Sequence, residues 1–285
     1  GAARVAKAAP DGYTFLLGGL AVLVQVPLTY KKPLYDPLAD FEFVTMFADQ
    51  ARVLIARKDF PADTFRDFVA YAKANQSKMQ FGSAGVGSGL HVCAVLLNST
   101  IDVNVTHVPY RGSAMAIRDL IGGRLDYMCE QISTAVSHIQ AGNAKPIATM
   151  GATRAAVLPD VPSTRESGYP NLDCGSWSAF LFPKGTAAAI VQRLERATAD
   201  AIDTPAVRDR FASIGVTVAA PAQRGAAFLT RHTKEELERW TGRKHDNRAT
   251  REFRRCARLG AGGPLPPPSR SHSLRPMSLA RGCWS

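Results

Sequence analysis

The chain has 285 residues, of which 46% are hydrophobic, 21% charged and 8% aromatic. These values are typical of a folded globular protein and exclude a collagen, a coiled coil and a wholly disordered chain. The net charge of +11 suggests a protein that binds polyanions, but the charge is unevenly placed. Residues 242–285 hold ten Lys/Arg and two acidic residues, whereas residues 1–241 carry 25 basic and 22 acidic groups. The body of the chain is therefore close to neutral.

Residues 242–285 differ in composition from the rest of the chain. They show no apolar periodicity, contain a proline run at 266–268, and have arginines in no regular pattern. Such a segment cannot bury enough apolar surface to offset its ordering entropy, so we interpret it as a disordered basic tail. A nucleic-acid-binding arm is the alternative, but only Phe253 and Trp284 could stack on bases, so we expect no nucleic-acid partner. Our hypothesis is that the tail is out-of-frame translation of a GC-rich gene.

The cysteines and the start of the chain give little information on the compartment. The five cysteines form no Cys-x-x-Cys pair, and their odd number does not indicate a disulfide framework. We therefore expect buried, apolar thiols at Cys93, Cys129, Cys174, Cys256 and Cys283. No apolar run reaches the about 18 residues that cross a bilayer. The sequence starts without an initiator Met, which suggests a fragment, so the missing signal peptide is uninformative about export.

Hydrophobic patterning predicts many short strands and helices. Strands are expected at residues 13–18, within 40–53, and at 78–81, 103–108, 125–129, 146–150 and 176–182. Helices are expected to begin near residues 61, 89, 113, 134, 186, 205 and 223. In the first of these helices, Phe65, Phe68, Val69 and Ala72 recur at the spacing of one helix face. Strands that alternate with helices through short loops predict an open, largely parallel α/β sheet.

A glycine-rich turn at residues 82–89 follows one strand and opens a helix. It lacks the Lys-Ser/Thr of a phosphate P-loop, the dinucleotide fingerprint and the Gly-x-Ser-x-Gly elbow of a hydrolase. Backbone N–H groups exposed at a helix N-terminus bind anions. The turn therefore indicates either an anion-binding loop or simply a tight connection.

Two further loops follow strands and precede helices. The first contains Tyr110, which offers a hydroxyl, Gly112, and Ser113, which is placed to cap the next helix. Arg111 in the same loop either pairs with a carboxylate or is solvated. The second loop spans residues 130–134. Because ligands of open α/β sheets bind at the carboxyl ends of the strands, the three loops together predict an anion-binding edge.

The sequence shows no catalytic or metal-binding group. The six histidines do not occur at metal-ligand spacing, and no Ser/His/Asp or Cys/His group can be assembled from their order. His91, His107 and His138 fall on separate expected elements, so we interpret each as packed or solvated. We expect no metal, no cofactor and no enzymatic activity.

Six segments resemble, in order and spacing, blocks of one protein family. They are AKAAPDGYTFLLG, YDPLADFEFV, GSAGVGSGLH, VPYRGSAMAIRDLIGGRLDYMCEQ, LPDVPSTRESG and SWSAFLFPKGT. From Gly1 to about Trp240, the chain resembles the Bug-type periplasmic substrate-binding proteins of tripartite tricarboxylate transporters. The resemblance implies a type II periplasmic-binding-protein fold, in which two α/β lobes joined by a hinge close on a carboxylate.

The resemblance also implies a division of the chain. Residues 1–50 would form part of the first lobe, 51–175 the second lobe, and 176–241 a return to the first lobe before the tail at 242–285. The crossings would lie near 48–57 and 176–182, and residues 18–22 would form a first-lobe loop near the ligand. Family members begin with a strand and an acidic loop that clasps the carboxylate. Because this sequence lacks that part, we expect the first lobe to be incomplete.

The binding residues implied by the resemblance lie in second-lobe loops that face the cleft. They are Ser83, Ala84, Gly85, Ser88, Tyr110, Gly112, Ser113, Glu130 and Gln131. Their expected role is to donate backbone N–H and hydroxyl hydrogen bonds to carboxylate oxygens, directly or through water.

The implied function is that of a periplasmic solute-binding protein, or a defective copy of one. It would act as a monomer that delivers a small carboxylate to the membrane permease subunits of the transporter, through exchange between open and closed lobes. The alternative is a ligand-binding sensor whose closed form is presented to a signalling partner.

Overall fold

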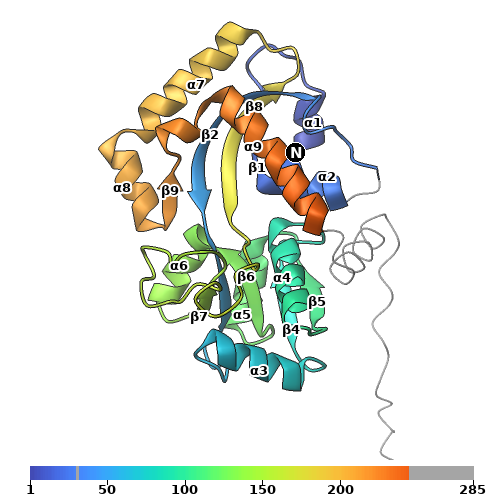
Figure 1. Cartoon of the computed structure of the whole chain (residues 1–285), viewed down its shortest axis with the longest axis vertical. Helices are drawn as coiled ribbons and strands as arrows, with labels where there is room; N and C mark the ends of the chain where they lie inside the picture. Colours follow the sequence, from blue (N-terminus) through green and yellow to red (C-terminus); the bar gives the residue numbers. More distant parts are fainter. Residues whose placement is uncertain (30–31, 244–285) are drawn as a thin grey trace, which may run out of the picture.

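The computed structural model describes residues 1–29 and 32–243, which form two lobes, each built around one β-sheet (Figure 1). The expected basic tail therefore lies outside the described residues, except for the end of the last helix at Arg243. The chain passes from the first sheet to the second at Ala51 and returns to the first sheet just before Ser176. The fold is α/β with two lobes, as predicted.

The first lobe contains a four-stranded antiparallel sheet. Its elements are α1 (Ala2–Ala6), β1 (Leu16–Gly19), η1 (Ala21–Gln25), α2 (Val26–Thr29), β2 (Phe41–Gln50), β8 (Ser176–Pro183), α7 (Ala188–Ile202), α8 (Pro205–Ser213), β9 (Val216–Val218), η2 (Pro221–Gln223) and α9 (Gly225–Arg243). The strand order is β1-β8-β2-β9. Leu23, Met46, Leu181 and Trp240 are buried in its core, so η1, two strands and α9 share one apolar interior.

The second lobe contains a five-stranded sheet in the order β5-β4-β6-β3-β7. Its elements are β3 (Arg52–Arg57), α3 (Phe65–Asn75), β4 (Gln80–Ser83), α4 (Gly89–Thr100), β5 (Thr106–Pro109), α5 (Ser113–Ile121), β6 (Tyr127–Gln131), α6 (Ile132–Gln140) and β7 (Ala144–Thr149). Strand β4 runs parallel to β5 and β6, but β3 is antiparallel to β6 and β7. Strands β4, β5, β6 and β7 therefore point the same way, so the prediction of a largely parallel sheet is correct for this lobe except at β3. Strand β3 follows β2 through Ala51 without an intervening helix. Its direction is therefore set by the crossing between the lobes and not by a helical crossover connection.

Strand β3 is buried on both faces. Leu54 and Ala56 lie in the core that includes α3 and α4, whereas Val53 and Ile55 lie in the core that includes α5 and α6. A strand covered by helices on both faces is apolar without alternation, which explains the continuous run at this position. This strand fixes the second-lobe sheet between two layers of helices.

Two helices begin and pack largely as the sequence indicates. Helix α3 starts at Phe65, slightly later than expected, because Thr64 caps it by accepting a hydrogen bond from Asp67 N at 3.1 Å. Helix α8 is capped by Thr204 and has Pro205 as its first residue. The buried residues of α3 are the predicted ones, Phe65, Phe68, Val69 and Ala72.

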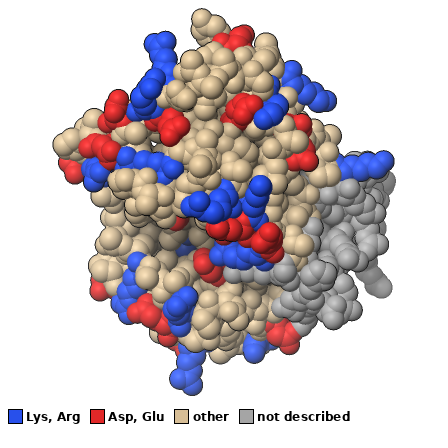
Figure 2. Space-filling model, turned by 45° about the horizontal axis from the view of Figure 1, so that its top comes forward, with Lys and Arg blue, Asp and Glu red and all other residues tan. Residues whose placement is uncertain are grey.

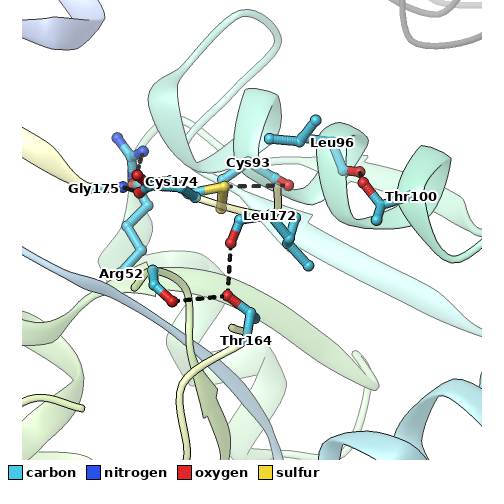
Figure 3. Close-up of a disulfide and its surroundings, with 10 residues drawn as sticks. Arg52, Cys93, Leu96, Thr100, Thr164, Leu172, Cys174 and Gly175 are labelled. Atoms are coloured by element: carbon cyan, nitrogen blue, oxygen red, sulfur yellow. Dashed lines mark hydrogen bonds between the residues drawn. A yellow bond between two sulfur atoms is a disulfide. The ribbon is translucent and has the colours of Figure 1, made fainter. Parts of the chain in front are cut away.

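A disulfide joins Cys93 of α4 to Cys174, which lies just before β8 (Figure 3). The two Cα atoms are 5.6 Å apart although the residues are separated by 81 positions. The expectation of free thiols is therefore wrong for this pair, because sequence spacing does not show that the fold brings the return crossing against α4. It is confirmed for Cys129, which is free and buried. Cys256 and Cys283 lie outside the described residues.

Candidate functional site

Three parallel strands of the second lobe end at the same edge of the sheet. Because β4 lies between β5 and β6 and runs parallel to both, their last residues Ser83, Pro109 and Gln131 lie at one edge. Helices α4, α5 and α6 begin directly after these strands. The first two loops touch, since Tyr110 N donates to Ser83 O at 3.1 Å. The structure thus brings together the three loops that the sequence singled out.

This edge faces the first lobe and the crossing. Ser133 Oγ, in the first turn of α6, donates to Oε1 of Gln50 at the end of β2, with a distance of 2.7 Å. Ile132 N donates to Ala51 O at 3.1 Å, directly at the crossing. The N-terminus of α6 therefore lies at the junction between the lobes, and those of α4 and α5 share its edge of the sheet.

The glycine-rich loop is fixed by two stacked histidine rings. The ring centroids of His91 and His107 are 4.0 Å apart. Ser83 Oγ lies 2.7 Å from His107 Nε2, and Gly87 N donates to His91 Nδ1 at 3.1 Å. Burial lowers the pKa of His91 to about 4, and burial together with His91 lowers the pKa of His107 to about 3. At neutral pH both rings are uncharged, so His91 Nδ1 can accept the bond from Gly87 N. The Ser83 hydroxyl, which contacts His107, also donates to Gly85 O at 3.1 Å and so ties the loop to itself.

The same loop leads into the capped N-terminus of α4. Ser88 Oγ accepts a hydrogen bond from His91 N at 3.3 Å, and Ser83 Oγ accepts one from Gly85 N at 3.1 Å. Gly85 and Gly87 have φ values of 119° and 79°, which L side chains rarely adopt. Ala84 lies between these fixed points and packs against the second-lobe core. The loop backbone is therefore rigidly placed by its glycines and its serines.

The second loop differs from the expectation in one respect. Helix α5 begins at Ser113 itself, and Gly112 occupies the N-cap position without a side-chain cap. The prediction that Ser113 caps the helix is therefore wrong, since the helix starts one residue earlier. The hydroxyl of Tyr110 donates to Asp119 Oδ2 at 2.7 Å, and burial, followed by this bond, raises the pKa of Tyr110 to about 12. Arg111 is exposed.

Glu130 and Gln131 lie at the end of β6. Only 1% of Glu130 is exposed, and burial raises the pKa of its carboxyl group to about 7. Its Oε1 accepts a hydrogen bond from Gln131 N at 2.8 Å, while Oε2 has no hydrogen-bond partner among the described residues. Burying a carboxyl oxygen without a hydrogen bond costs free energy, so Glu130 is an unusual residue for the interior of this lobe.

Arg52, the first residue of β3, was not among the site residues predicted from the sequence. Its side chain is only 1% exposed, and Nη1 donates to Cys174 O at 2.7 Å, beside the disulfide (Figure 3). The guanidinium packs against Gly89, where an added Cβ would clash with Nη2, and Gln25 Oε1 of the first lobe lies 3.1 Å from that same Cβ position. The signal that could have found it is a charged residue at the start of the apolar run ARVLIA.

The surface and the titratable groups give two further observations. Within residues 1–29 and 32–243, no group of three or more His, Cys, Asp or Glu side chains is placed to hold a metal ion. On the face shown in Figure 2, Lys/Arg and Asp/Glu are interspersed, in agreement with the nearly neutral charge of the chain body.

Comparison with known proteins identifies the family. The model of the family described as tripartite tricarboxylate transporter family receptor matches residues 1–243. A UPF0065 protein of Agrobacterium vitis is 38% identical over 84% of this chain and 69% of its own length. Protein BugT of Bordetella pertussis is 31% identical over 85% of this chain and 74% of its own length.

Solved structures of periplasmic binding proteins have the same fold. The periplasmic binding protein BugD is 32% identical with a TM-score of 0.82, over 86% of this chain and 81% of BugD. MatC of Rhodopseudomonas palustris, solved with bound malate, is 36% identical with a TM-score of 0.80, over 84% of this chain and 81% of MatC. Another protein of that organism, solved with adipate, is 28% identical with a TM-score of 0.79, over 90% of this chain and 81% of its own.

In the described part of the chain, no helix is both long enough and apolar enough to traverse a lipid bilayer. The sequence blocks, the two-lobed fold and these relatives agree. The chain belongs to the tripartite tricarboxylate transporter receptor family.

Proposed function

We propose that this protein is a periplasmic solute-binding receptor that captures a small carboxylate between its lobes and delivers it to membrane permease subunits. The observation that carries the proposal is the convergence of three helix N-termini on the edge that faces the first lobe. Helix N-termini bind anions through unpaired N–H groups and the helix dipole. Relatives solved with malate and with adipate support a carboxylate as the ligand.

The proposed binding residues are those at the ends of β4, β5 and β6. Backbone N–H groups would make most of the contacts, because several hydroxyls already have partners: Ser83 Oγ contacts His107, and Tyr110 donates to Asp119. Ser88 Oγ accepts a bond and keeps its own proton for donation. The remaining proposed contacts come from Ala84, Gly85, Gly112, Ser113, Glu130 and Gln131.

We further propose that residues 1–50 and 176–241 form the first lobe and residues 51–175 form the second. The protein would act as a monomer whose two lobes close on the ligand. Opening and closing would bend the chain at Ala51 and before Ser176, the two places where it crosses between the sheets. Ligand that contacts both lobes stabilises the closed state and shifts the population toward it. The closed form would then be the one that the permease recognises.

An enzymatic role has one feature in its favour, the contact of 2.7 Å between Ser83 Oγ and His107 Nε2. A catalytic base must take up a proton near the working pH. Burial lowers the pKa of His107 to about 3, so this ring is a poor base at neutral pH. We therefore propose that the Ser83–His107 contact positions the loop and that the protein is not an enzyme.

Thermal unfolding with a panel of carboxylates tests the proposal. Malate, adipate, succinate and acetate are compared with malamide, which has a similar shape but no charge. A ligand present at about 100 times its dissociation constant stabilises the folded state by about 2.7 kcal/mol. For a chain of this size that shift raises Tm by several degrees. The proposal is contradicted if no carboxylate raises Tm and titration calorimetry detects no binding.

A further inference from the structure

Arg52 is a buried cation that forms no salt bridge with any carboxylate in the described part of the chain. Its side chain is 1% exposed, and no carboxylate of residues 1–29 or 32–243 lies within ion-pair distance of it. Nη1 has one hydrogen bond, to Cys174 O, and Nε has none among the described residues. Burial lowers the pKa of Arg52 to about 10, so the group is still charged at neutral pH. A buried, unpaired charge destabilises a protein unless an anion compensates it.

The guanidinium is directed at the N-terminus of α4. Gly89 is the first residue of that helix, and an added Cβ there would collide with Nη2 of Arg52. The helix N-terminus carries a partial positive charge of its own. Two positive groups thus meet at one point without a protein anion between them, on the side where Gln25 of the first lobe approaches. This arrangement is electrostatically unfavourable until an anion binds there.

Glu130 interacts electrostatically with Arg52 but forms no salt bridge with it, so it compensates the charge only in part. Its Oε1 is bonded to Gln131 N, and neither carboxyl oxygen lies within ion-pair distance of Arg52. Burial raises the pKa of Glu130 to about 7, so part of the population is neutral at physiological pH. Arg52 therefore keeps a hydrogen-bond donor, Nε, and part of its charge for a carboxylate from outside the chain.

We propose that Arg52 determines the ligand specificity of this receptor by binding one carboxylate of the ligand, together with the first backbone N–H groups of α4. The inference rests on the proposed function and adds the residue that selects a carboxylate over a neutral group of the same shape. Gly89 is required because any larger residue would displace the guanidinium. Arginine suits this role because its planar fork matches the geometry of a carboxylate.

Titration calorimetry of the full chain with malate and adipate tests the role of Arg52. The variants are Arg52→Gln, Arg52→Lys and the control Arg57→Gln, which removes the same charge from the same strand. Arg57 contacts Asp59 at 2.6 Å and Asp126 at 3.3 Å, and it lies at the opposite end of β3. We expect Arg52→Gln to weaken binding about 10- to 100-fold, Arg52→Lys to recover part of it, and Arg57→Gln to leave it unchanged.

Two additional measurements separate a binding role from a structural one. The Tm of unliganded Arg52→Gln should stay close to that of the wild type, because removal of a buried charge that has no salt bridge offsets the loss of the hydrogen bond to Cys174 O. The ¹⁵N resonance of Arg52 Nε should shift when malate or adipate saturates the wild-type chain, and this signal is informative even if Arg52→Gln fails to fold. The inference is overturned if the wild type binds with an unchanged Nε resonance, or if Arg52→Gln binds as tightly. If the wild type binds neither these probes nor the other carboxylates, the proposed function itself is wrong.

Discussion

Removal of the disulfide between Cys93 and Cys174 should strongly destabilise the second lobe. The bond links α4 to the segment before β8, across 81 positions of sequence. In the unfolded chain it closes a long loop and so lowers the conformational entropy of that state. The loop-closure relation gives about 4.5 kcal/mol at 25 °C for a loop of this length.

The perturbation is the double variant Cys93→Ala/Cys174→Ala, with Cys129→Ala as the matched control. Cys129 is a free, buried thiol in the same core, so its substitution reports the loss of sulfur packing without the loss of a cross-link. Urea unfolding followed by circular dichroism should give a free energy lower by about 4.5 kcal/mol for the double variant, and by about 1 kcal/mol for the control. The corresponding fall in Tm is roughly 10–15 °C.

Reduction of the wild type provides an independent comparison. Dithiothreitol should lower the unfolding free energy of the wild type to near that of the double variant and leave the double variant unchanged. The reasoning fails if the oxidised wild type and the double variant unfold within about 1 kcal/mol of each other. It also fails if Cys93 and Cys174 are alkylated in the unreduced, denatured protein, since the cross-link would then be absent.

Three further predictions concern the edge of the second-lobe sheet. Burial raises the folded-state pKa of Glu130 from 4.5 to about 7. The free energy of unfolding should therefore fall by about 3 kcal/mol as pH rises through that interval. Urea unfolding at pH 5 and pH 8 measures this difference, and Glu130→Gln should make it smaller. Burial lowers the folded-state pKa values of His91 and His107 below 6.5. The free energy of unfolding should therefore also fall as pH drops from about 6.5 toward 4. In acid unfolding, His107→Phe should reduce that loss. Ser88→Ala and Thr204→Ala each remove a helix cap and should cost about 1 kcal/mol in thermal unfolding. Only Ser88→Ala should weaken the binding of malate, because α4, unlike α8, begins at the edge of the second-lobe sheet where the ligand is proposed to bind.

The order of elements could be predicted from local patterns, but the reversed direction of β3 could not. Apolar periodicity located α3, and the Thr204–Pro205 pair located the start of α8. The antiparallel direction of β3 depends on its direct continuation from β2 through Ala51, a property of the whole chain path. A strand buried on both faces gives the same apolar run whichever way it points.

The same holds for the site: features marked by neighbouring residues could be predicted from the sequence, whereas contacts between distant residues could not. The loops that follow β4, β5 and β6 could be found because glycines and helix starts mark them in sequence. The stacking of His91 on His107 could not, since their rings meet only when α4 packs beside β5. Arg52 has no neighbouring motif. It can be recognised as a candidate binding residue only once the structure shows that it is buried and that its Nε has no hydrogen-bond partner among the described residues.

The disulfide, Arg52 and the start of α4 form one connected unit. Gly89 and Cys93 are four residues apart on α4 and therefore lie on the same face of the helix. Cys93 is bonded to Cys174, the carbonyl of Cys174 accepts a hydrogen bond from Arg52, and Arg52 packs against Gly89. Gln25 of the first lobe already lies beside this second-lobe surface, whose charged group is oriented by the cross-link, so opening of the lobes would separate the two. Because the same cross-link orients Arg52 and stabilises the fold, its removal should weaken carboxylate binding as well as folding.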